Sequence, residues 1–525
     1  MKAAFHTLGC KVNSYETQAI KEQFLALGFE EASFDEASDV YVVNTCSVTQ
    51  VAERKSRQML HRARSLAPES LIVAAGCYVQ EDAESLLENR DADIVVGNSE
   101  KSKIAEIVLE KLEERKQETE GNSLPGGESS FSAPNKKGPE NSLFSGKSSL
   151  PPKGPEASVE ENHQSGTAAS PKEEDGNGQE SLPVNLKTSG RKNSEGQAKD
   201  RTLENLYVED LRRSRDFESQ KISGAGDHVR AYIKIQDGCD RFCSYCIIPY
   251  LRGRSRSRAK AEILSEAQTL ANNGYKEIIL TGIDVSDYRQ EGLRAGDESF
   301  SDLIKACAGI SGIERIRLGS LECSLITSDF ISSLKGVPQF CPQFHLSLQS
   351  GSDTVLKRMN RKYTSGEYFE KTELIRKYFP GAAITTDIIV GFPKESEEEF
   401  EETCAFVKKV GFSRTHVFKY SLRKGTRAAA MEGQIDGNIK AERSEALIGI
   451  TKSLQKEYEE KLIGREVSVL IEEKTEDGLQ AGYTPEYVKI AVKSGRDLVN
   501  QIVTVIPVKF TDTEEGKILL AETKS

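Results

Sequence analysis

Three closely spaced cysteines place the strongest constraint on what this chain of 525 residues can fold into. Cys239, Cys243 and Cys246 have the spacing CxxxCxxC and follow the apolar run 231–235. Three thiolates this close together can hold three corners of a [4Fe–4S] cube, and the fourth iron then has no protein ligand. An electron carrier normally supplies cysteine to every iron, so the open position predicts that another molecule binds there.

A structural zinc site is the other interpretation of this spacing. Zinc prefers four ligands, typically in paired CxxC motifs, and no fourth Cys or His follows Cys246 nearby. S-adenosylmethionine can bind an open iron through its amino and carboxylate groups, and an electron from the cluster then cleaves it to a 5′-deoxyadenosyl radical. Together with Tyr245 just before the last cysteine, the motif predicts a radical-SAM enzyme.

A second set of cysteines is spread over the N-terminal part of the chain. Cys10, Cys46 and Cys77 each follow the C-terminal end of a different expected strand. Ligands of open parallel sheets bind at those strand ends, so we expect the three thiols to converge and hold an auxiliary cluster. Free cysteine also packs as a small hydrophobic residue, which leaves a core role open for each thiol taken alone. The other cysteines show no ligand spacing and are interpreted as core or incidental residues: Cys307, Cys323, Cys341 and Cys404.

Strand-like and helix-like runs alternate in two parts of the chain, which predicts an α/β protein with parallel sheets. Residues 1–116 are expected to form a parallel-sheet α/β domain, and residues 226–455 a partial (βα)6 barrel of the radical-SAM kind. The expected strands of these two parts are 3–8, 40–43, 71–75, 94–96, 231–235, 277–280, 315–318, 343–348, 383–390 and 413–420.

Two further segments differ in composition from these α/β parts. Residues 117–225 are expected to be a disordered low-complexity linker, because 121–200 holds eight of the 16 prolines and only two aromatic residues, Phe131 and Phe144. Such a segment cannot bury enough apolar surface to offset its ordering entropy.

Residues 460–525 contain four short strand-like runs with Gly-containing turns, which predict a small β-barrel. Those runs are 466–471, 487–492, 501–507 and 518–521.

Composition narrows the class of protein. No run of about 18 apolar residues is present to cross a bilayer, and the N-terminus lacks a secretory signal pattern, so we expect a cytoplasmic protein. Ten cysteines in a long cytoplasmic chain point to metal binding rather than to disulfides. The formal net charge of -11 argues against nucleic-acid binding by the whole surface, although a local basic patch is compatible with it.

The motifs around both cysteine sets resemble the methylthiotransferase family of radical-SAM enzymes, and they extend over nearly all of the chain except the linker. They are Gly9-Cys-Lys-Val-Asn13, Asn44-Thr-Cys-Ser-Val-Thr49, Lys55-Ser-Arg-Gln58, Gly76-Cys-Tyr78, His345-Leu-Ser-Leu-Gln-Ser-Gly351, Met359-Asn-Arg361, Thr386-Asp-Ile-Ile-Val-Gly-Phe-Pro393 and Tyr420-Ser-Leu-Arg-Lys-Gly-Thr426. Lys11-Val-Asn13 and the segment 46–56 are similar to the subgroup acting on N6-threonylcarbamoyladenosine in tRNA. The isopentenyladenosine enzymes would typically read GCQMN at the first motif, and the ribosomal-protein enzymes GCPKN.

The resemblance implies a methylthiolation at C2 of N6-threonylcarbamoyladenosine at position 37 of tRNA, with two [4Fe–4S] clusters and two molecules of S-adenosylmethionine. One S-adenosylmethionine would methylate sulfur carried on the cluster at Cys10, Cys46 and Cys77. The other, on the cluster at Cys239, Cys243 and Cys246, would give the radical that activates the base. The implied partners are a tRNA anticodon stem-loop, a sulfur donor and an electron donor of the flavodoxin or ferredoxin type.

Supporting residues follow from the same resemblance. Thr281 and Gly282 occupy the position where the superfamily binds the amino group of S-adenosylmethionine, and a glycine there lets the backbone approach the ligand closely. Asn13 and Asn44 flank the auxiliary thiols and are expected to shape that site. Four more residues end or follow strands and are expected to contact S-adenosylmethionine, with a structural role left open: Gln349, Ser350, Arg361 and Asp387.

RNA contacts are expected in two places. A basic run follows the cluster motif, where phosphate neutralisation would hold an anticodon stem, and a solvated helix entry is the alternative. The run consists of Arg252, Arg254, Arg256, Arg258 and Lys260. The C-terminal segment resembles a TRAM domain, a small RNA-binding barrel, although its acidic balance limits binding to a local face. His345 and His416 lie in expected strands and are interpreted as hydrogen-bonded histidines rather than metal ligands.

Two alternative functions remain open at this level. The chain could be a methylthiotransferase for another tRNA base or for a ribosomal protein. It could also be a zinc-stabilised, non-enzymatic RNA-binding protein that uses the β-rich C-terminal segment.

Overall fold

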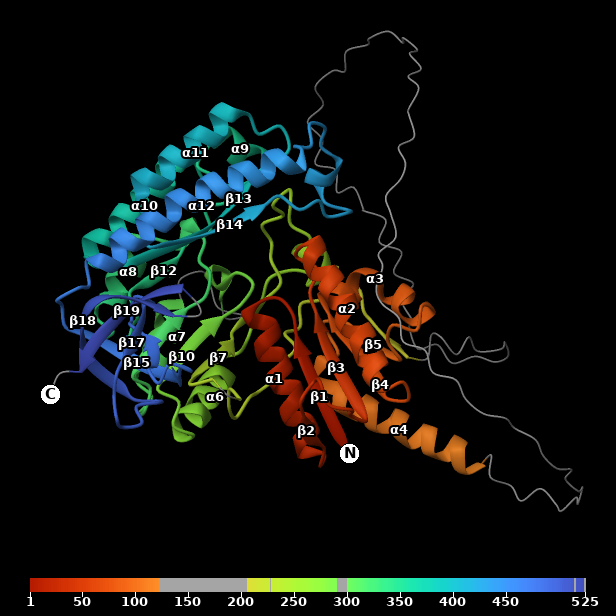
Figure 1. The fold of residues 1–525 in the computed structure, drawn as a ribbon. Coiled ribbons are helices and arrows are strands. Elements are labelled where there is room, and N and C mark those ends of the chain that lie inside the picture. The colour runs from red at the N-terminus through yellow and green to blue at the C-terminus, as the bar shows by residue number, and fades with distance from the viewer. Residues whose placement is uncertain (122–204, 227, 290–299, 514–515, 524–525) are drawn as a thin grey trace, which may run out of the picture. The chain divides into compact units, whose positions relative to one another are not determined.

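The computed structural model describes residues 1–121, 205–226, 228–289, 300–513 and 516–523 (Figure 1). The described residues of 1–112 and 205–523 belong to one compact unit. Most of the expected linker, residues 122–204, lies outside the described residues. Within the described ranges, no helix is long and apolar enough to cross a membrane.

The N-terminal region contains a six-stranded parallel sheet in the order β2-β1-β3-β4-β5-β6. Its strands are β1 (Lys2–Thr7), β2 (Glu30–Ala32), β3 (Val40–Thr45), β4 (Leu71–Gly76), β5 (Ile94–Val96) and β6 (Leu206–Tyr207). Helices α1 (Lys11–Ala26) and α4 (Ile104–Gly121) cover one face, and α2 (Gln50–Leu66) and α3 (Cys77–Glu88) cover the other. Every residue of β3 and β4 is buried, as expected of parallel strands between two helical layers.

The last strand of this sheet comes from the segment expected to be linker. β6 pairs with β5 although 84 residues separate Gly121, where α4 ends, from Leu206. The range 117–225 therefore overlaps regular structure at both ends. A strand of two residues shows no periodicity, which is why its sequence did not predict it.

The central region is a partial barrel of six parallel strands, which confirms the expected architecture. Sheet β11-β10-β7 and sheet β12-β13-β14 are joined by the bridges Ile316↔Phe340 and Leu321↔Leu346. The strands are β7 (Arg230–Lys234), β10 (Glu277–Thr281), β11 (Arg315–Leu318), β12 (Gln343–His345), β13 (Ala383–Val390) and β14 (Arg414–Lys419). The helices are α5 (Ile248–Leu251), α6 (Lys260–Asn272), α7 (Phe300–Ala308), α8 (Ser328–Lys335), α9 (Asp353–Arg358), α10 (Ser365–Tyr378), α11 (Glu397–Val410) and α12 (Gly437–Glu460).

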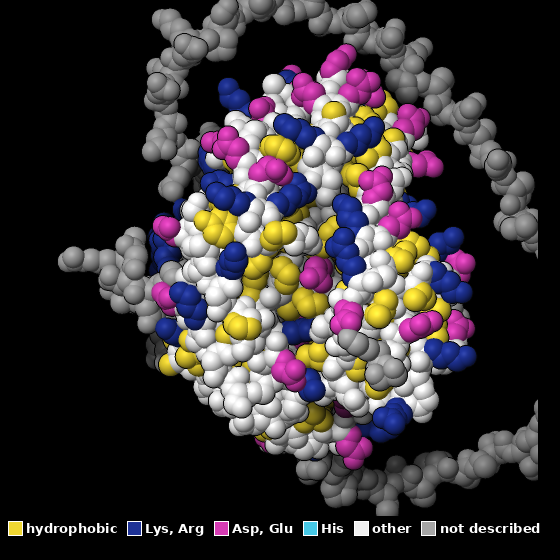
Figure 2. Space-filling model, turned by 90° about the vertical axis from the view of Figure 1, so that its left-hand side faces the viewer, with side chains coloured by type: hydrophobic (Ala, Val, Ile, Leu, Met, Phe, Trp, Pro, Cys, Tyr) yellow, Lys and Arg dark blue, Asp and Glu magenta, His cyan; other side chains and the backbone are white. Residues whose placement is uncertain are grey.

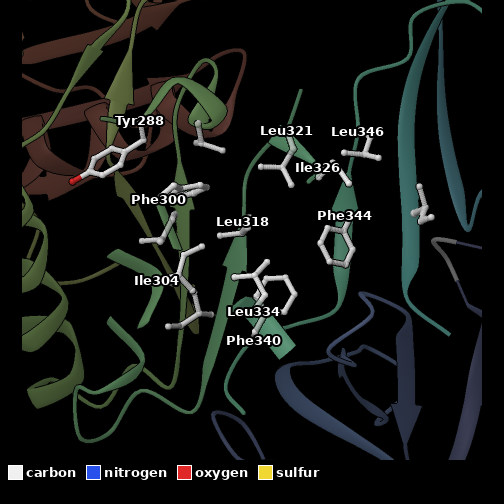
Figure 3. Packing of buried hydrophobic residues seen from close by; sticks show 14 of the residues in the cluster. Tyr288, Phe300, Ile304, Leu318, Leu321, Ile326, Leu334, Phe340, Phe344 and Leu346 are labelled. Atoms are coloured by element: carbon white, nitrogen blue, oxygen red, sulfur yellow. The ribbon is translucent and has the colours of Figure 1, made fainter. Parts of the chain in front are cut away.

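One apolar core holds the helices of the barrel against its strands. Figure 3 shows Phe300 and Ile304 of α7 on one side of Leu318, which lies on β11, and Phe344 of β12 on the other. Helix starts are marked in the sequence as well, because α10 and α11 each begin with a capping box that satisfies free backbone N–H groups.

The C-terminal region is a closed five-stranded barrel in the order β15-β16-β17-β19-β18, which confirms the expected small β-barrel. Its strands are β15 (Val467–Lys474), β16 (Gln480–Tyr483), β17 (Lys489–Val492), β18 (Ile502–Thr513) and β19 (Gly516–Thr523). It packs on the central barrel through Arg317, which donates to the Pro485 carbonyl at 2.8 Å and stacks on the Tyr487 ring at 4.8 Å. On the molecular face drawn in Figure 2, Lys and Arg side chains are interspersed with Asp and Glu.

Candidate active site

The three N-terminal cysteines meet at one edge of the N-terminal sheet. Cys10 precedes α1, Cys46 follows β3 and Cys77 opens α3 directly after β4. Gly9 has a φ of +104°, and a Cβ placed there would lie 2.8 Å from the Cys46 Sγ. Only glycine fits this close approach without displacing the sulfur. The structure therefore brings together the three thiols that the sequence predicts to converge.

Two asparagine amides hold the loops that carry these thiols. The Asn13 Nδ2 donates to the Leu8 carbonyl at 2.7 Å and to the Thr45 carbonyl at 3.0 Å. The Asn44 Nδ2 donates to the Asn13 carbonyl at 3.0 Å. These bonds tie the turn before Cys10 to the end of β3, which agrees with the expectation that both asparagines shape the site.

The central cysteines lie on a tight loop after β7. The short strands β8 (Gln236–Asp237) and β9 (Arg256–Ser257) pair with each other and close this loop, and the Cys239 N–H donates to the Gly253 carbonyl at 3.1 Å. The Arg361 Nη1 donates to the Cys243 Sγ at 3.3 Å. Hydrogen bonds to sulfur of this kind tune iron–sulfur clusters.

The thiols suit a cluster better than they suit a single ion. Burial raises the pKa of Cys46 and of Cys246 to about 12, and the charge of Cys77 adds to both shifts. These thiols need a nearby metal charge to ionise at neutral pH. Nowhere in the described part of the chain do three His, Cys, Asp or Glu side chains form a group that could hold one metal ion. Cysteine thiolates are the usual ligands of iron–sulfur clusters, so the chemistry of the two all-cysteine donor sets fits such clusters.

The loop of Cys239 depends on a glycine whose replacement gives a sharp test. Gly238 has a φ of +72°, and a Cβ there would lie 1.9 Å from the Arg254 carbonyl oxygen. Gly238→Ala should therefore cost about 1–2 kcal/mol of backbone strain and about 1–3 kcal/mol of overlap in addition. Urea unfolding and iron content after anaerobic reconstitution would measure the loss of stability and of one cluster.

Gly274→Ala is the matched control for this substitution. Gly274 has a φ of +87°, but nothing lies within 4 Å of a Cβ built there, so only the backbone strain should remain. If both variants lost the same stability and kept the same iron, the close approach at Gly238 would have no role in the cluster loop.

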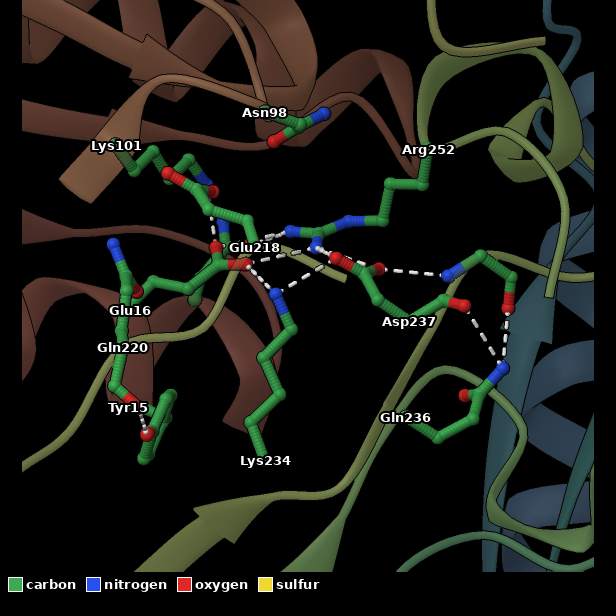
Figure 4. A network of polar contacts seen from close by, with 12 residues as sticks. Tyr15, Glu16, Asn98, Lys101, Glu218, Gln220, Lys234, Gln236, Asp237 and Arg252 are labelled. Atoms are coloured by element: carbon green, nitrogen blue, oxygen red, sulfur yellow. Dashed lines mark hydrogen bonds and ion pairs between the residues drawn. The ribbon is translucent and has the colours of Figure 1, made fainter. Parts of the chain in front are cut away.

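Figure 4 shows a buried ionic network around Glu16, Asp237 and Arg252. The Glu16 carboxylate accepts from Lys101, from the Lys234 Nζ at 2.7 Å and from the Arg252 Nη1 at 2.9 Å. Arg252 also donates from Nε to the Cys77 Sγ at 3.3 Å and from Nη1 to Asp237 at 3.1 Å. One guanidinium thus touches an auxiliary thiol and the carboxylate two residues before Cys239.

The expected phosphate-binding role of the basic run is wrong for three of its arginines. Arg252, Arg256 and Arg258 are 0%, 6% and 1% exposed, respectively. Arg252 and Arg256 pair with Asp237, and Arg258 pairs with Glu266. Arg254 is half-buried and pairs with Asp240 at 3.3 Å. The sequence alone does not show which carboxylates fold against these arginines, so the run looks solvated.

A cavity of about 440 Å³ lies inside the central barrel, a volume typical of ligand pockets. Cys10 of the auxiliary set lines it together with Thr281 and Gly282, which follow β10. Asp387 of β13 lines it as well and accepts from the His345 Nε2 at 3.3 Å. The cavity therefore brings an auxiliary thiol together with three of the residues expected to bind S-adenosylmethionine.

The other three residues expected to bind S-adenosylmethionine lie elsewhere. Arg361 lines a second cavity of about 300 Å³ together with Cys243. The Ser350 hydroxyl is fully buried and lies 3.2 Å from the Thr403 Oγ1, while the Gln349 N–H donates to the Asp387 carbonyl at 2.9 Å. Neither Gln349 nor Ser350 lines these two cavities, so their contacts favour the structural role.

Several cavity-lining residues were not singled out from the sequence as ligand-binding residues. They are Lys11, Arg317, His345, Arg414, His416 and Tyr487. A signal was present, because polar side chains recur at every second position in β12, β13 and β14, as strand residues facing a barrel interior do. His345 is also bonded to the Thr385 hydroxyl at 3.0 Å, in agreement with its interpretation as a hydrogen-bonded histidine.

Comparison with known proteins places this site in a family. Residues 233–407 match the radical SAM superfamily, and residues 2–97 match a family described as uncharacterized protein family UPF0004. A threonylcarbamoyladenosine tRNA methylthiotransferase MtaB from Bacillus subtilis is 34% identical over 507 residues, which span 96% of this chain and 92% of that protein. Its counterpart from Aquifex aeolicus is 32% identical over 90% of this chain and 93% of that protein.

A relative with a different substrate name matches a shorter stretch. A tRNA-2-methylthio-N(6)-dimethylallyladenosine synthase from Acetivibrio thermocellus is 39% identical over 56% of this chain and 61% of that protein. Another such synthase, from Thermodesulfovibrio yellowstonii, is 29% identical over 91% of this chain and 89% of that protein. The MtaB relatives named above reach 32–34% identity over a similar share of the chain. This chain, an iron–sulfur enzyme of tRNA modification, therefore belongs to the radical-SAM methylthiotransferase family and to its MtaB type.

Proposed function

We propose that this enzyme adds a methylthio group to C2 of N6-threonylcarbamoyladenosine at position 37 of tRNA, with two [4Fe–4S] clusters and two molecules of S-adenosylmethionine. The observation that carries the proposal is the barrel cavity, where Cys10 of one cysteine set faces Thr281, Gly282 and Asp387. A sulfur-inserting reaction needs a sulfur carrier and a radical source that both reach one substrate. The presence of two cysteine sets in this chain supports such a reaction.

Each cysteine set has its own role in this proposal. Cys239, Cys243 and Cys246 hold one cluster, and Cys10, Cys46 and Cys77 hold the other. When bound, the first cluster supplies the electron that cleaves S-adenosylmethionine, and the second carries the sulfur to be transferred. The protein contributes binding, orientation and the exclusion of water around the reacting atoms.

Arginine side chains position both sets of thiols. Arg361 donates to the Cys243 Sγ, and its remaining donors are held by Glu322 at 2.6 Å and by the Tyr363 hydroxyl at 2.9 Å. Arg252 donates to the Cys77 Sγ in the same way. Because each guanidinium is fixed by other partners, it orients its sulfur before any cluster binds.

S-adenosylmethionine binds next to these thiols in the proposal. The Thr281 and Gly282 backbone and the Asp387 carboxylate would contact it from the barrel cavity, and Arg361 would contact it from beside Cys243. A Cβ at Gly282 would lie 2.9 Å from the Gln236 carbonyl oxygen, so the backbone at this position is closely packed. Gln349 and Ser350 support the strand ends.

The partners in this proposal are a tRNA anticodon stem-loop, a sulfur donor and an electron donor of the flavodoxin or ferredoxin type. Residues 1–116 form the auxiliary-cluster domain and residues 226–455 the radical-SAM domain. Residues 460–525 form a TRAM-like RNA-binding domain. The closed barrel of five short strands supports the TRAM-like assignment.

Mass spectrometry of tRNA nucleosides tests the substrate. A strain lacking this enzyme should lose the methylthio form of N6-threonylcarbamoyladenosine and accumulate N6-threonylcarbamoyladenosine without the methylthio group. The wild-type gene should restore the methylthio form. An unchanged nucleoside pattern would overturn the proposal, and selective loss of methylthio-dimethylallyladenosine would redirect it to the other substrate. Anaerobic reconstitution should give about eight irons per chain, whereas stoichiometric zinc without S-adenosylmethionine cleavage would support the non-enzymatic alternative.

A further inference from the structure

Two cations that line the barrel cavity make no hydrogen bond or ion pair within the described residues. Lys11, at the start of α1, and Arg414, at the start of β14, both line the cavity, and neither makes a hydrogen bond or an ion pair within the described ranges. Arg317 also lines the cavity, but it already has partners within the protein, because it donates to Glu277 at 2.9 Å and stacks on the Tyr487 ring. Lys11 and Arg414 are therefore available to a ligand.

The charges that line the cavity are unbalanced. Lys11, Arg317 and Arg414 supply three cations, and Asp387 is the single carboxylate among the described lining residues. Asp387 is itself shared with His345. Lys11 and Arg414 are exposed in the open cavity, so a ligand that enters it meets an excess of positive charge, which suits an anionic ligand.

The position of Lys11 indicates which part of the ligand is anionic. Lys11 follows Cys10 in the chain, so its exposed side chain lines the cavity next to the auxiliary thiol. In the proposed function, the cluster at Cys239, Cys243 and Cys246 would hold the carboxylate of the radical-generating S-adenosylmethionine. Lys11 and Arg414 would then be left to bind another carboxylate.

We propose that Lys11 and Arg414 bind the carboxylate of the threonyl group on the substrate base. This inference rests on the proposed function, and it assigns substrate selection to these two side chains. A threonylcarbamoyl group carries a carboxylate that an apolar dimethylallyl group lacks. A pocket with two free cations favours the acidic modification, and a dimethylallyl group would leave both cations unpaired.

Two stem-loops that differ only at the carboxylate test this proposal. One carries N6-threonylcarbamoyladenosine at position 37, and the other carries its neutral methyl ester. The reconstituted wild-type enzyme should turn over the acid with a lower KM than the ester. Lys11→Gln and Arg414→Gln should each raise KM for the acid by about 10- to 100-fold, as expected when a charge-assisted hydrogen bond is lost, with little change for the ester.

Control measurements separate this effect from general damage. Lys419→Gln alters an exposed cation at the end of the same strand, outside the cavity lining, and should leave KM for both stem-loops unchanged. Stem-loop affinity by fluorescence anisotropy should show the same acid-specific loss as KM. Because Lys11 is next to Cys10, the iron content of the Lys11→Gln variant should be measured to check that it still binds both clusters. Arg414→Gln changes a residue far from Cys10 in the sequence and serves as an independent test.

The outcomes distinguish this inference from the function on which it rests. If the wild-type enzyme did not act on the acid, the proposed function and the carboxylate site would both be lost. If it acted on the acid but both variants weakened acid and ester equally, the function would stand and the carboxylate site would be overturned. If both variants instead lost affinity for S-adenosylmethionine, the bound carboxylate would belong to that molecule and not to the substrate.

Discussion

Cys243→Ala is expected to abolish reductive cleavage of S-adenosylmethionine, whereas Cys46→Ala should keep much of that cleavage and form no methylthiolated product. The reason is that the two thiols belong to different sets, one on the loop after β7 and one after β3. Removing Cys243 also takes away the sulfur that accepts from Arg361. Chromatography of 5′-deoxyadenosine and mass spectrometry of the digested stem-loop measure the two steps separately.

Cys404→Ala is the control for both cysteine variants. Cys404 is half-buried on α11 and belongs to neither set, so its replacement should leave iron content and both activities intact. Full product formation by Cys46→Ala would show that the auxiliary set has been misassigned. If Cys243→Ala cleaved S-adenosylmethionine at the wild-type rate, the central set would be misassigned.

Glu16→Gln is expected to destabilise the protein by about 3–5 kcal/mol, as breaking a buried ion pair does. The variant leaves Lys101, Lys234 and Arg252 without the carboxylate that they share, and none of these side chains is more than 2% exposed. Urea unfolding of the full chain measures the change. Glu36→Gln removes an exposed partner of Lys2 at 3.9 Å and should cost only about 0–1 kcal/mol.

The effect of Glu16 should also depend on pH in a defined direction. Burial opposes ionisation of Glu16, but Arg252, Lys101 and Lys234 outweigh it and hold the pKa of this carboxyl well below its ordinary range. A lowered folded-state pKa stabilises the protein above the unfolded-state pKa, and this contribution is lost as the pH falls toward the folded-state pKa. The difference in unfolding free energy between wild type and Glu16→Gln should therefore stay constant near neutral pH and shrink in acid. A difference that grew in acid would contradict the network.

The strands could be predicted because each is a short local run of residues. The N-terminal cysteine set could be predicted because each of its cysteines follows the end of a strand. β4 and β5 coincide with apolar runs almost to the residue, since buried parallel strands are apolar on both faces. β10, β11 and β13 also match the expected ranges almost to the residue, although polar side chains interrupt them. The convergence of Cys10, Cys46 and Cys77 follows from parallel topology, which places the ends of successive strands at one edge. β16 was missed because a short strand containing Gly482 has no clear pattern.

The buried ion pairs could not be predicted from local patterns. Glu16 and Arg252 are 236 residues apart, and Arg258 reaches the Tyr15 hydroxyl across 243 residues. A cation is solvated or buried according to what folds against it, and a sequence window around residues 252–260 does not contain those partners. The closeness of Lys11 and Arg414 could not be predicted for the same reason, because separate regions of the chain bring the two side chains to one cavity.

The placement of β6 has a further consequence for how the protein can be divided. Residues 1–121 contain the auxiliary thiols, and residues 205–525 contain the central thiols together with β6. A chain broken between Gly121 and Leu206 would give two fragments that still share a sheet, since the Gly97 N–H donates to the Tyr207 carbonyl at 2.7 Å, and that also share the Glu16–Arg252 ion pair. Each fragment would carry one complete cysteine set. The enzyme could thus be assembled from two polypeptides whose clusters are loaded, labelled or omitted independently.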